Sequence, residues 1–207
     1  MELVQVNEGA LAAFGQAAAA LSGDMKPILR CEKGDWYLGK DKDEIVVGTR
    51  FALDMMSAEW GWLLWRNKKV EDRRMTLVAS GQQPAPRADL GHTDSALWDR
   101  GDDGQPVDPW SKTIELPARE ISGERREVTI SGSSKGWEGC CKQLFKAFGE
   151  QMRANPGKHP VIELANGKYN HPKWGIVKVP VLNIVEWKSD AELAAGDTPA
   201  TKGKSRF

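Results

Sequence analysis

One amphipathic stripe, followed by two strand-like runs, most constrains the fold of this chain. Its apolar residues recur at helical spacing and are Trp137, Cys140, Cys141, Leu144, Phe145, Phe148 and Met152. Ser133 or Ser134 can cap the helix start, Glu138 suits the first turn, and the Asn-Pro-Gly at 155–157 ends the pattern. The stripe predicts one main helix with both of its Cys residues in the core. A redox or nucleophilic Cys pair is the alternative.

The rest of the central sequence consists of short runs that are typical of strands. They are rich in Val, Ile, Thr and Trp and are bounded by Gly, Pro, Asp or Asn. The predicted strands are Pro27–Glu32, Trp36–Gly39, Ile45–Met56, Trp60–Trp65, Arg74–Ala79, Thr113–Leu116, Glu127–Ser131, Pro160–Leu164 and Gly175–Trp187. Polar and apolar residues alternate in 113–116 and 127–131, which predicts that these two strands are half-buried. Asn67-Lys68-Lys69 is predicted to connect a hairpin.

The order of these elements predicts a mainly β domain with one main helix, in the α+β class. A five-stranded Greek-key barrel of the OB type also has its helix before its last two strands. We therefore expect an OB-like Greek-key barrel with extra strands and loops; a β-sandwich with a surface helix is the alternative. Residues 1–24 are predicted to form an N-terminal arm or short helix, and 25–188 the single OB-like domain. Residues 189–207 have almost nothing to bury and are predicted to be a disordered C-terminal tail.

Charge and composition narrow the class of partner. The 207 residues include 29 Lys and Arg and 29 Asp and Glu, which excludes a polycation and an acidic nucleic-acid mimic but not a local basic face. Residues 112–188 are net basic and 41–111 are net acidic. No apolar run approaches the roughly 20 residues of a membrane span, and no basic segment precedes the Ala-rich start. We therefore expect no membrane partner and a cytoplasmic location. The three Cys residues also favour the reducing cytoplasm, because they form neither a disulfide framework nor a Cys-x-x-Cys metal motif.

Catalytic signatures are missing from the sequence. His92, His159 and His171 are far apart, and no serine-hydrolase, zinc-protease or P-loop motif occurs. The acidic loop from Arg87 to Trp110 does not fit the EF-hand pattern. We predict that the protein is not an enzyme and binds no cofactor or metal, with a divalent-ion site in the acidic loop as the alternative. Trp98 and Trp110 are predicted to anchor that loop to the body.

The aromatic residues suggest stacking on nucleic-acid bases. The chain has nine Trp against five Phe and two Tyr. On a strand, Trp60 and Trp62 point to one face and Trp65 to the other. Two indoles side by side would form a platform for bases, and cations follow at the adjoining turn. The predicted nucleic-acid-binding residues here are Trp60, Trp62, Arg66, Lys68, Lys69 and Arg73; the alternative is that these Trp residues fill the barrel or an oligomer interface.

A second cluster lies between the last two predicted strands, where an OB-fold has a loop that borders its ligand groove. It mixes aromatic rings, cations and hydrogen-bonding groups on a predicted turn, and consists of Lys168, Tyr169, His171, Lys173 and Trp174. A long hairpin loop with Trp174 covering the core is the alternative. Lys135 lies in the Gly-Ser-Ser-Lys-Gly turn before the helix and is also predicted to contact a phosphate of the nucleic acid. The alternative is that this turn only caps the helix.

Short motifs give the chain a resemblance to a group of small phage and prophage proteins. They are GKDKDEIVVGT at 39–49, EWGW at 59–62, DPW at 108–110, SSKG at 133–136, and PVIEL at 160–164 followed by Tyr169, His171 and Gly175. The group is similar in layout to phage OB-fold single-stranded-DNA-binding proteins, and the resemblance spans residues 26–188. One departure is the C-terminus, which keeps the terminal Phe207 of bacterial-type proteins but is basic instead of acidic. Recruitment of replication partners through that end is therefore doubtful.

Together, the residues and the resemblance predict a non-enzymatic single-stranded-DNA-binding protein of phage-type replication or recombination. The resemblance implies that it acts in the cytoplasm of the host cell, and association into a homo-oligomer is left open. The alternative is a phage structural or protein-interaction protein, such as a host-defence inhibitor, whose Trp-rich faces bind protein.

Overall fold

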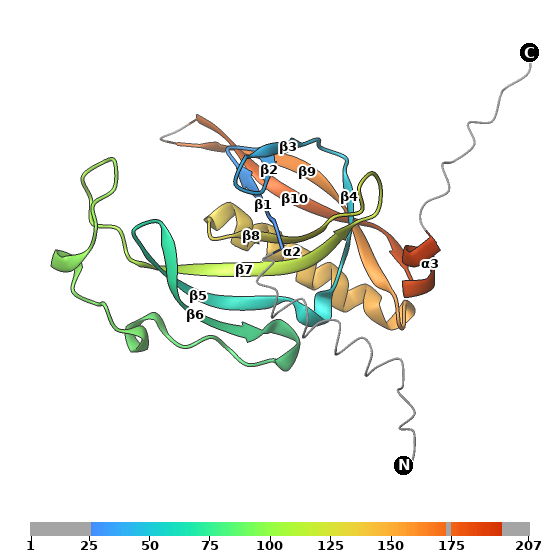
Figure 1. Ribbon diagram of the computed structural model, residues 1–207, viewed down its shortest axis with the longest axis horizontal. Coiled ribbons are helices and arrows are strands. Elements are labelled where there is room, and N and C mark those ends of the chain that lie inside the picture. Colours follow the sequence, from blue (N-terminus) through green and yellow to red (C-terminus); the bar gives the residue numbers. More distant parts are fainter. Residues whose placement is uncertain (1–25, 173–174, 196–207) are drawn as a thin grey trace, which may run out of the picture.

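The computed structural model describes residues 26–172 and 175–195. The predicted N-terminal arm, residues 196–207 of the predicted tail, and two predicted site residues, Lys173 and Trp174, lie outside the described residues. The described chain is mainly β with one main helix, as the sequence predicts, and its strands form an open sheet with mixed pairing (Figure 1). Within that part, no helix is long and apolar enough to cross a bilayer.

The sheet has the spatial order β10-β9-β4-β7-β8-β1-β2-β3 (Figure 1). Its strands are β1 (Ile28–Glu32), β2 (Asp35–Leu38), β3 (Asp43–Ile45), β4 (Arg50–Leu53), β5 (Glu59–Arg66), β6 (Lys69–Leu77), β7 (Trp110–Glu120), β8 (Glu127–Gly132), β9 (His159–His171) and β10 (Gly175–Lys188). β4 and β5 pair with successive parts of the same edge of β7, at 118–120 and 110–115, and β6 pairs with β5. The helices are α2 (Lys135–Gln151) and the short α3 (Asp190–Ala195), with 3-10 turns between strands.

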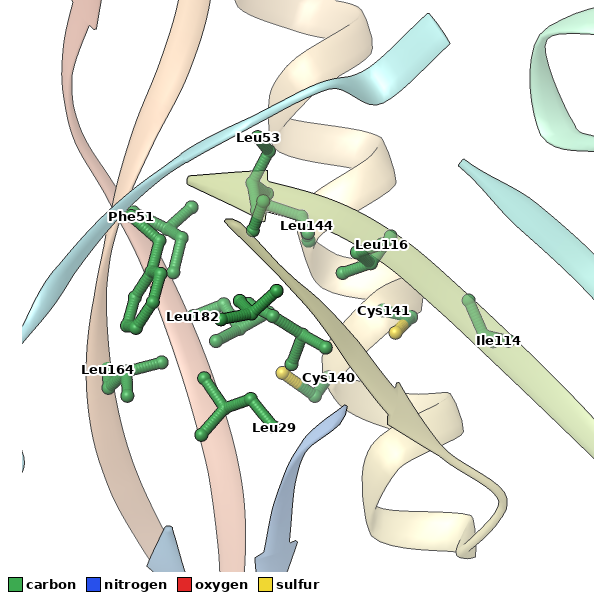
Figure 2. Close-up of a cluster of buried hydrophobic side chains, with 14 of the residues drawn as sticks. Leu29, Phe51, Leu53, Ile114, Leu116, Cys140, Cys141, Leu144, Leu164 and Leu182 are labelled. Atoms are coloured by element: carbon green, nitrogen blue, oxygen red, sulfur yellow. The ribbon is translucent and has the colours of Figure 1, made fainter. Parts of the chain in front are cut away.

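The predicted helix is confirmed. Its N-cap is Ser134, whose hydroxyl accepts a hydrogen bond from the backbone N–H of Trp137 at 3.1 Å. The stripe buries Trp137, Cys140, Cys141 and Leu144, and α2 packs against β10. Figure 2 shows both Cys side chains directed into the cluster of buried side chains between α2 and the strands. The core therefore lies between the helix and one face of the sheet.

The burial of the two Cys residues fits core packing better than reactivity. Desolvation raises the pKa of the Cys140 thiol to about 12, and it also raises the pKa of Cys141. The reactive form of a Cys is the thiolate, so raising its pKa slows its chemistry. The third thiol, Cys31 on β1, is only half-buried.

We expect a thiol reagent such as DTNB at pH 8 to modify Cys140 and Cys141 at least about a hundredfold more slowly in the folded protein than in urea. Cys31 should react first, and a Cys31→Ser variant should remove that early phase. Rapid native modification of the remaining pair would contradict their role as core side chains.

Several of the predicted strand boundaries are wrong: β6 begins at Lys69 instead of Arg74, and β7 spans Trp110–Glu120 instead of 113–116. Two further differences change the topology. The predicted run 45–56 divides into β3 and β4, because Val46 and Val47 are exposed and Gly48 adopts a φ of +96°. The cluster predicted as a turn after residue 164 is instead a continuation of β9 to His171, paired in register with β10, as in the pair Lys168 and Lys178. Backbone hydrogen bonds across this long hairpin hold a sequence that by itself resembles a loop.

The first residues of the predicted tail also differ from the expectation. Ser189 and Glu192 form a capping box at the start of α3: the Ser189 N–H donates to the Glu192 carboxylate at 2.7 Å, and the Glu192 N–H donates to the Ser189 hydroxyl at 3.3 Å. Leu193 packs against a small buried cluster of Ala52, Ile121 and Val161, and Arg125 donates to the Leu193 carbonyl. Residues 189–195 are thus docked on the domain.

Candidate nucleic-acid interface

The predicted tryptophan pair is partly covered by the chain itself. Trp60 and Trp62 lie on the same face of β5, and both indoles hold the segment that follows β6. The indole N–H of Trp60 donates to the Gln82 carbonyl at 3.3 Å, and that of Trp62 donates to the Ala85 carbonyl at 2.9 Å. Both side chains are half-buried. In this arrangement they tie a long connection to the sheet, and they do not form an open platform.

The predicted hairpin between β5 and β6 is confirmed. Asn67 and Lys68 both have positive φ values, of 50° and 61°, as in the two-residue turns that join antiparallel strands. Lys68 and Lys69 are exposed at this end. Arg66 is partly neutralised, because it pairs with Glu71 at 3.1 Å and contacts the His92 ring nitrogen at 3.0 Å.

The fourth predicted cation of this group, Arg73, lies in the middle of β6, the outer strand of the hairpin, and not at the turn. Arg73 bonds to Glu59 and, at 3.0 Å, to Glu115. Burial raises the pKa of the Glu115 carboxyl, an effect that the nearby Arg73 opposes. Arg73 is therefore shared between two carboxylates of neighbouring strands and carries little free charge.

The second predicted cluster lies on the β9–β10 hairpin and at the start of α2. Tyr169 is about half exposed, and its ring contacts that of His171 edge-on at 6.3 Å, while Lys168 is exposed on the same strand. Lys135 is the first residue of α2 and pairs with Glu138 at 3.1 Å. None of these four side chains lines the groove described next.

An open groove of about 740 Å³, here called the sheet groove, crosses the face of the sheet opposite the core. Its floor comes from the polar positions of the two half-buried strands, because side chains alternate between the faces of a strand. These positions are Thr113 and Glu115 of β7 and Thr129 and Ser131 of β8. The groove thus lies over the strand pair β7–β8.

The walls of the sheet groove come from neighbouring strands. The β5–β6 hairpin contributes Leu63, Trp65 and Arg73, and β1 contributes Ile28 and Arg30. Of the predicted site residues that the structure describes, Arg73 alone is among those that line this groove. The groove therefore combines apolar, polar and charged side chains from at least four strands.

The sheet groove is lined by charged side chains of both signs. Lys26 lies at the rim and pairs with Glu127 at 2.9 Å, and Glu32 and Glu115 add negative charge. Arg30, by contrast, has no ion-pair partner among residues 26–172 and 175–195 and is exposed. The groove offers one unpaired guanidinium and two cations that are already paired.

Trp65 is the site residue that the sequence interpretation missed. Its side chain is 42% exposed and lines both the sheet groove and a second pocket of about 540 Å³, here called the loop pocket. The sequence does place Trp65 on the strand face opposite Trp60 and Trp62. The alternation in 113–116 and 127–131 was a further signal, since it indicates that each of these strands has a polar face. The sequence does not show, however, that the two strands pair and bring their polar faces together.

Three carboxylates of the acidic loop are used by the loop itself. Asp94 and Asp103 accept backbone N–H groups, and Asp108 binds Arg87 through both of its oxygens, at 2.6 and 2.7 Å. Within the described ranges, no group of three or more His, Cys, Asp or Glu side chains is placed to hold a metal ion. Trp110 is buried at one end of the loop, as an anchor would be.

Comparison of the chain with family models, curated proteins and solved structures finds no match. The function has therefore to be argued from the residues and geometry of the chain.

Proposed function

We propose that this is a non-enzymatic single-stranded-DNA-binding protein, and that the DNA strand lies in the sheet groove. The observation that carries the proposal is the exposed Trp65 beside a polar sheet face, with the unpaired Arg30 on the opposite wall. Stacking on an aromatic ring contributes about 1–3 kcal/mol per base, and it tolerates any sequence because every base has a π-face. The groove is open to solvent, as a polymer ligand requires.

The strand arrangement supports the proposal, because it follows an OB-type order. In an OB-fold the first strand pairs with the second and fourth, the fifth pairs with the fourth, and the helix lies between the third and fourth. Here β4 pairs with β7 and β9, β10 pairs with β9, and α2 lies between β8 and β9. β1 pairs in parallel with β8, where the fifth strand would close a barrel. We infer an OB-like sheet whose closing edge is occupied by β1–β3.

With the OB-like arrangement inferred above, the sheet groove corresponds to the position in which OB-folds bind oligonucleotides. They use the face of the second and third strands between two loops, the first–second and the fourth–fifth connections. In this protein those strands are β7 and β8. The first connection includes the β5–β6 hairpin, and the second joins β9 to β10; the β5–β6 hairpin and the described ends of β9 and β10 next to that connection lie in the left half of Figure 1. The charge of the groove favours moderate, salt-sensitive affinity.

A protein-interaction role is the second candidate. It is favoured by β10, a long strand at the end of the sheet order with exposed apolar side chains at Ile176 and Val185. An unpaired strand edge can add a strand from another chain. In the DNA-binding proposal, the same edge would serve partners in phage-type replication or recombination, in the host cytoplasm.

We expect a fluorescein-labelled oligonucleotide of single-stranded DNA to bind at low salt, with affinity falling as salt rises. Trp65→Ala should weaken binding by about 1–3 kcal/mol, or roughly 5- to 150-fold, because one stacking partner is lost. Fluorescence anisotropy titration measures both effects.

Trp187→Ala is the matched control. Trp187 stacks on Phe148 of α2 with ring centroids 5.7 Å apart, and it does not line the sheet groove. Its replacement should leave affinity unchanged. Equal losses of affinity in the two variants would show that Trp65 does not contact the DNA. Absence of binding by the wild-type protein at low salt would refute the proposed function.

A further inference from the structure

The loop pocket adjoins the sheet groove through Trp65, which lines both. On one side it is formed by the β5–β6 turn, with Arg66 and Asn67. On the other side it is formed by the 92–99 segment of the acidic loop, with Pro109 completing the lining. A strand that stacks on Trp65 in the groove therefore reaches this pocket within the next nucleotides. The sequence interpretation included one lining residue, Arg66, among the nucleic-acid-binding residues, but it did not predict a base pocket between the hairpin turn and the acidic loop.

The outer wall of the loop pocket is held in place by Arg87. Besides its paired bonds to Asp108, Arg87 donates to the carbonyls of Gly91 at 2.8 Å and His92 at 3.0 Å. Its guanidinium also lies over the Trp98 ring, 5.8 Å from the centroid, and the Trp98 indole donates to the His92 carbonyl at 2.8 Å. Partial burial works to raise the pKa of Asp108, but the bonds from Arg87 and from the Trp110 N–H lower it overall. The wall is thus preformed.

The lining suits a nucleobase better than a phosphate. Trp65, Trp98 and the 83% exposed Leu97 offer flat and apolar contact surface. The cation of the pocket, Arg66, is already paired with Glu71, so little positive charge is left for a phosphate. A ring that enters between these side chains would exchange water for stacking and van der Waals contact.

The polar groups of the pocket select among the bases. The Asp99 carboxylate makes no hydrogen bond or ion pair within the described part of the chain, and one oxygen of Asp94 is used by the Ala96 N–H. Carboxylate oxygens only accept hydrogen bonds, and Asp and Glu pair with the exocyclic amine of cytosine. Thymine has no exocyclic amine: its unpaired edge has a single N3–H donor between two carbonyl oxygens, and these oxygens would repel a carboxylate that approaches the N–H.

We propose that the loop pocket binds one amine-bearing base of the bound strand, with Asp99 accepting from the exocyclic amine of cytosine. This inference rests on the proposed function and adds a base preference to it. Since stacking on Trp65 is indifferent to sequence, discrimination between cytosine and thymine would come from the loop pocket.

The test compares oligo-dC with oligo-dT of the same length by anisotropy titration at fixed salt and neutral pH. The wild-type protein should prefer oligo-dC by about 5-fold or more, within the roughly 1–3 kcal/mol of a good base contact. Asp99→Ala should bring the ratio of the two affinities close to one. Asp102→Ala is the control, because it removes an exposed carboxylate of the same loop that does not line the pocket, and it should keep the preference.

Three outcomes would count against the proposal, and they are distinguishable. Equal wild-type affinities for oligo-dC and oligo-dT, with Trp65→Ala weakening both, would overturn the loop pocket and leave the proposed function standing. If Asp102→Ala also lost the preference for oligo-dC, the preference would come from the general charge of the loop, and the proposed base binding in the loop pocket would be refuted. Failure of the wild-type protein to bind either oligonucleotide would refute the function and the pocket together.

Discussion

Replacing Trp137 by Ala is expected to lower the free energy of unfolding by about 3–5 kcal/mol, the cost of deleting a large buried aromatic side chain. Trp137 is 3% exposed in the core, and its indole N–H donates to the Ile114 carbonyl of β7 at 3.0 Å. The variant loses this bond and leaves a cavity where α2 begins. A thermal melt should show a drop of roughly 6–20 °C, and urea denaturation gives the free energy directly.

Trp65→Ala provides the comparison for stability, because it deletes the same side chain from a surface site. Its exposed indole has little to lose on truncation, so the free energy of unfolding should change by less than about 1 kcal/mol. If the two variants were equally stable, Trp137 would not be the link between α2 and β7 that the structure shows.

The sequence predicts those parts of the fold whose signals are local. The helix over residues 135–151 could be recognised from its own spacing and from the cap at Ser134, and the hairpin from the residues at 67–69. The capping box of Ser189 and Glu192 was an equally local signal. It was overlooked because the low apolar content of the following residues favoured disorder.

The candidate site depends on pairings between strands that are distant in sequence. The sheet groove exists because β7 joins β5 on one edge and β8 on the other, which brings Trp65, Thr113 and Ser131 to one face. Alternation within a strand shows that two faces differ, but not which neighbour each face meets. Trp60 and Trp62 illustrate the limit: nothing local indicates that the chain at 82–85 returns to cover them.

The β5–β6 hairpin is the element on which both the sheet groove and the loop pocket depend, and Gly61 determines how closely its strands approach. A Cβ atom at position 61 would lie 2.8 Å from the Met75 Cα and closer still to the Arg74 carbonyl oxygen. These are backbone atoms of β6, so a methyl group cannot be accommodated by turning a side chain. The two strands would have to separate locally.

Gly61→Ala is therefore expected to destabilise the protein by about 3 kcal/mol, at the upper end of overpacking costs. It should also weaken single-stranded-DNA binding at least as much as Trp65→Ala, because the displaced hairpin carries Trp65.

Gly139→Ala is the matched control: Gly139 lies in α2 with no atom within 4 Å of an added Cβ. In a helix this change should add about 0.5–1 kcal/mol of stability, and it should leave DNA affinity unchanged. Urea denaturation and anisotropy titration of both variants decide the matter. A Gly61→Ala protein with wild-type stability would show that β5 and β6 tolerate the methyl group, and wild-type affinity despite a measured destabilisation would show that the hairpin does not position the DNA strand.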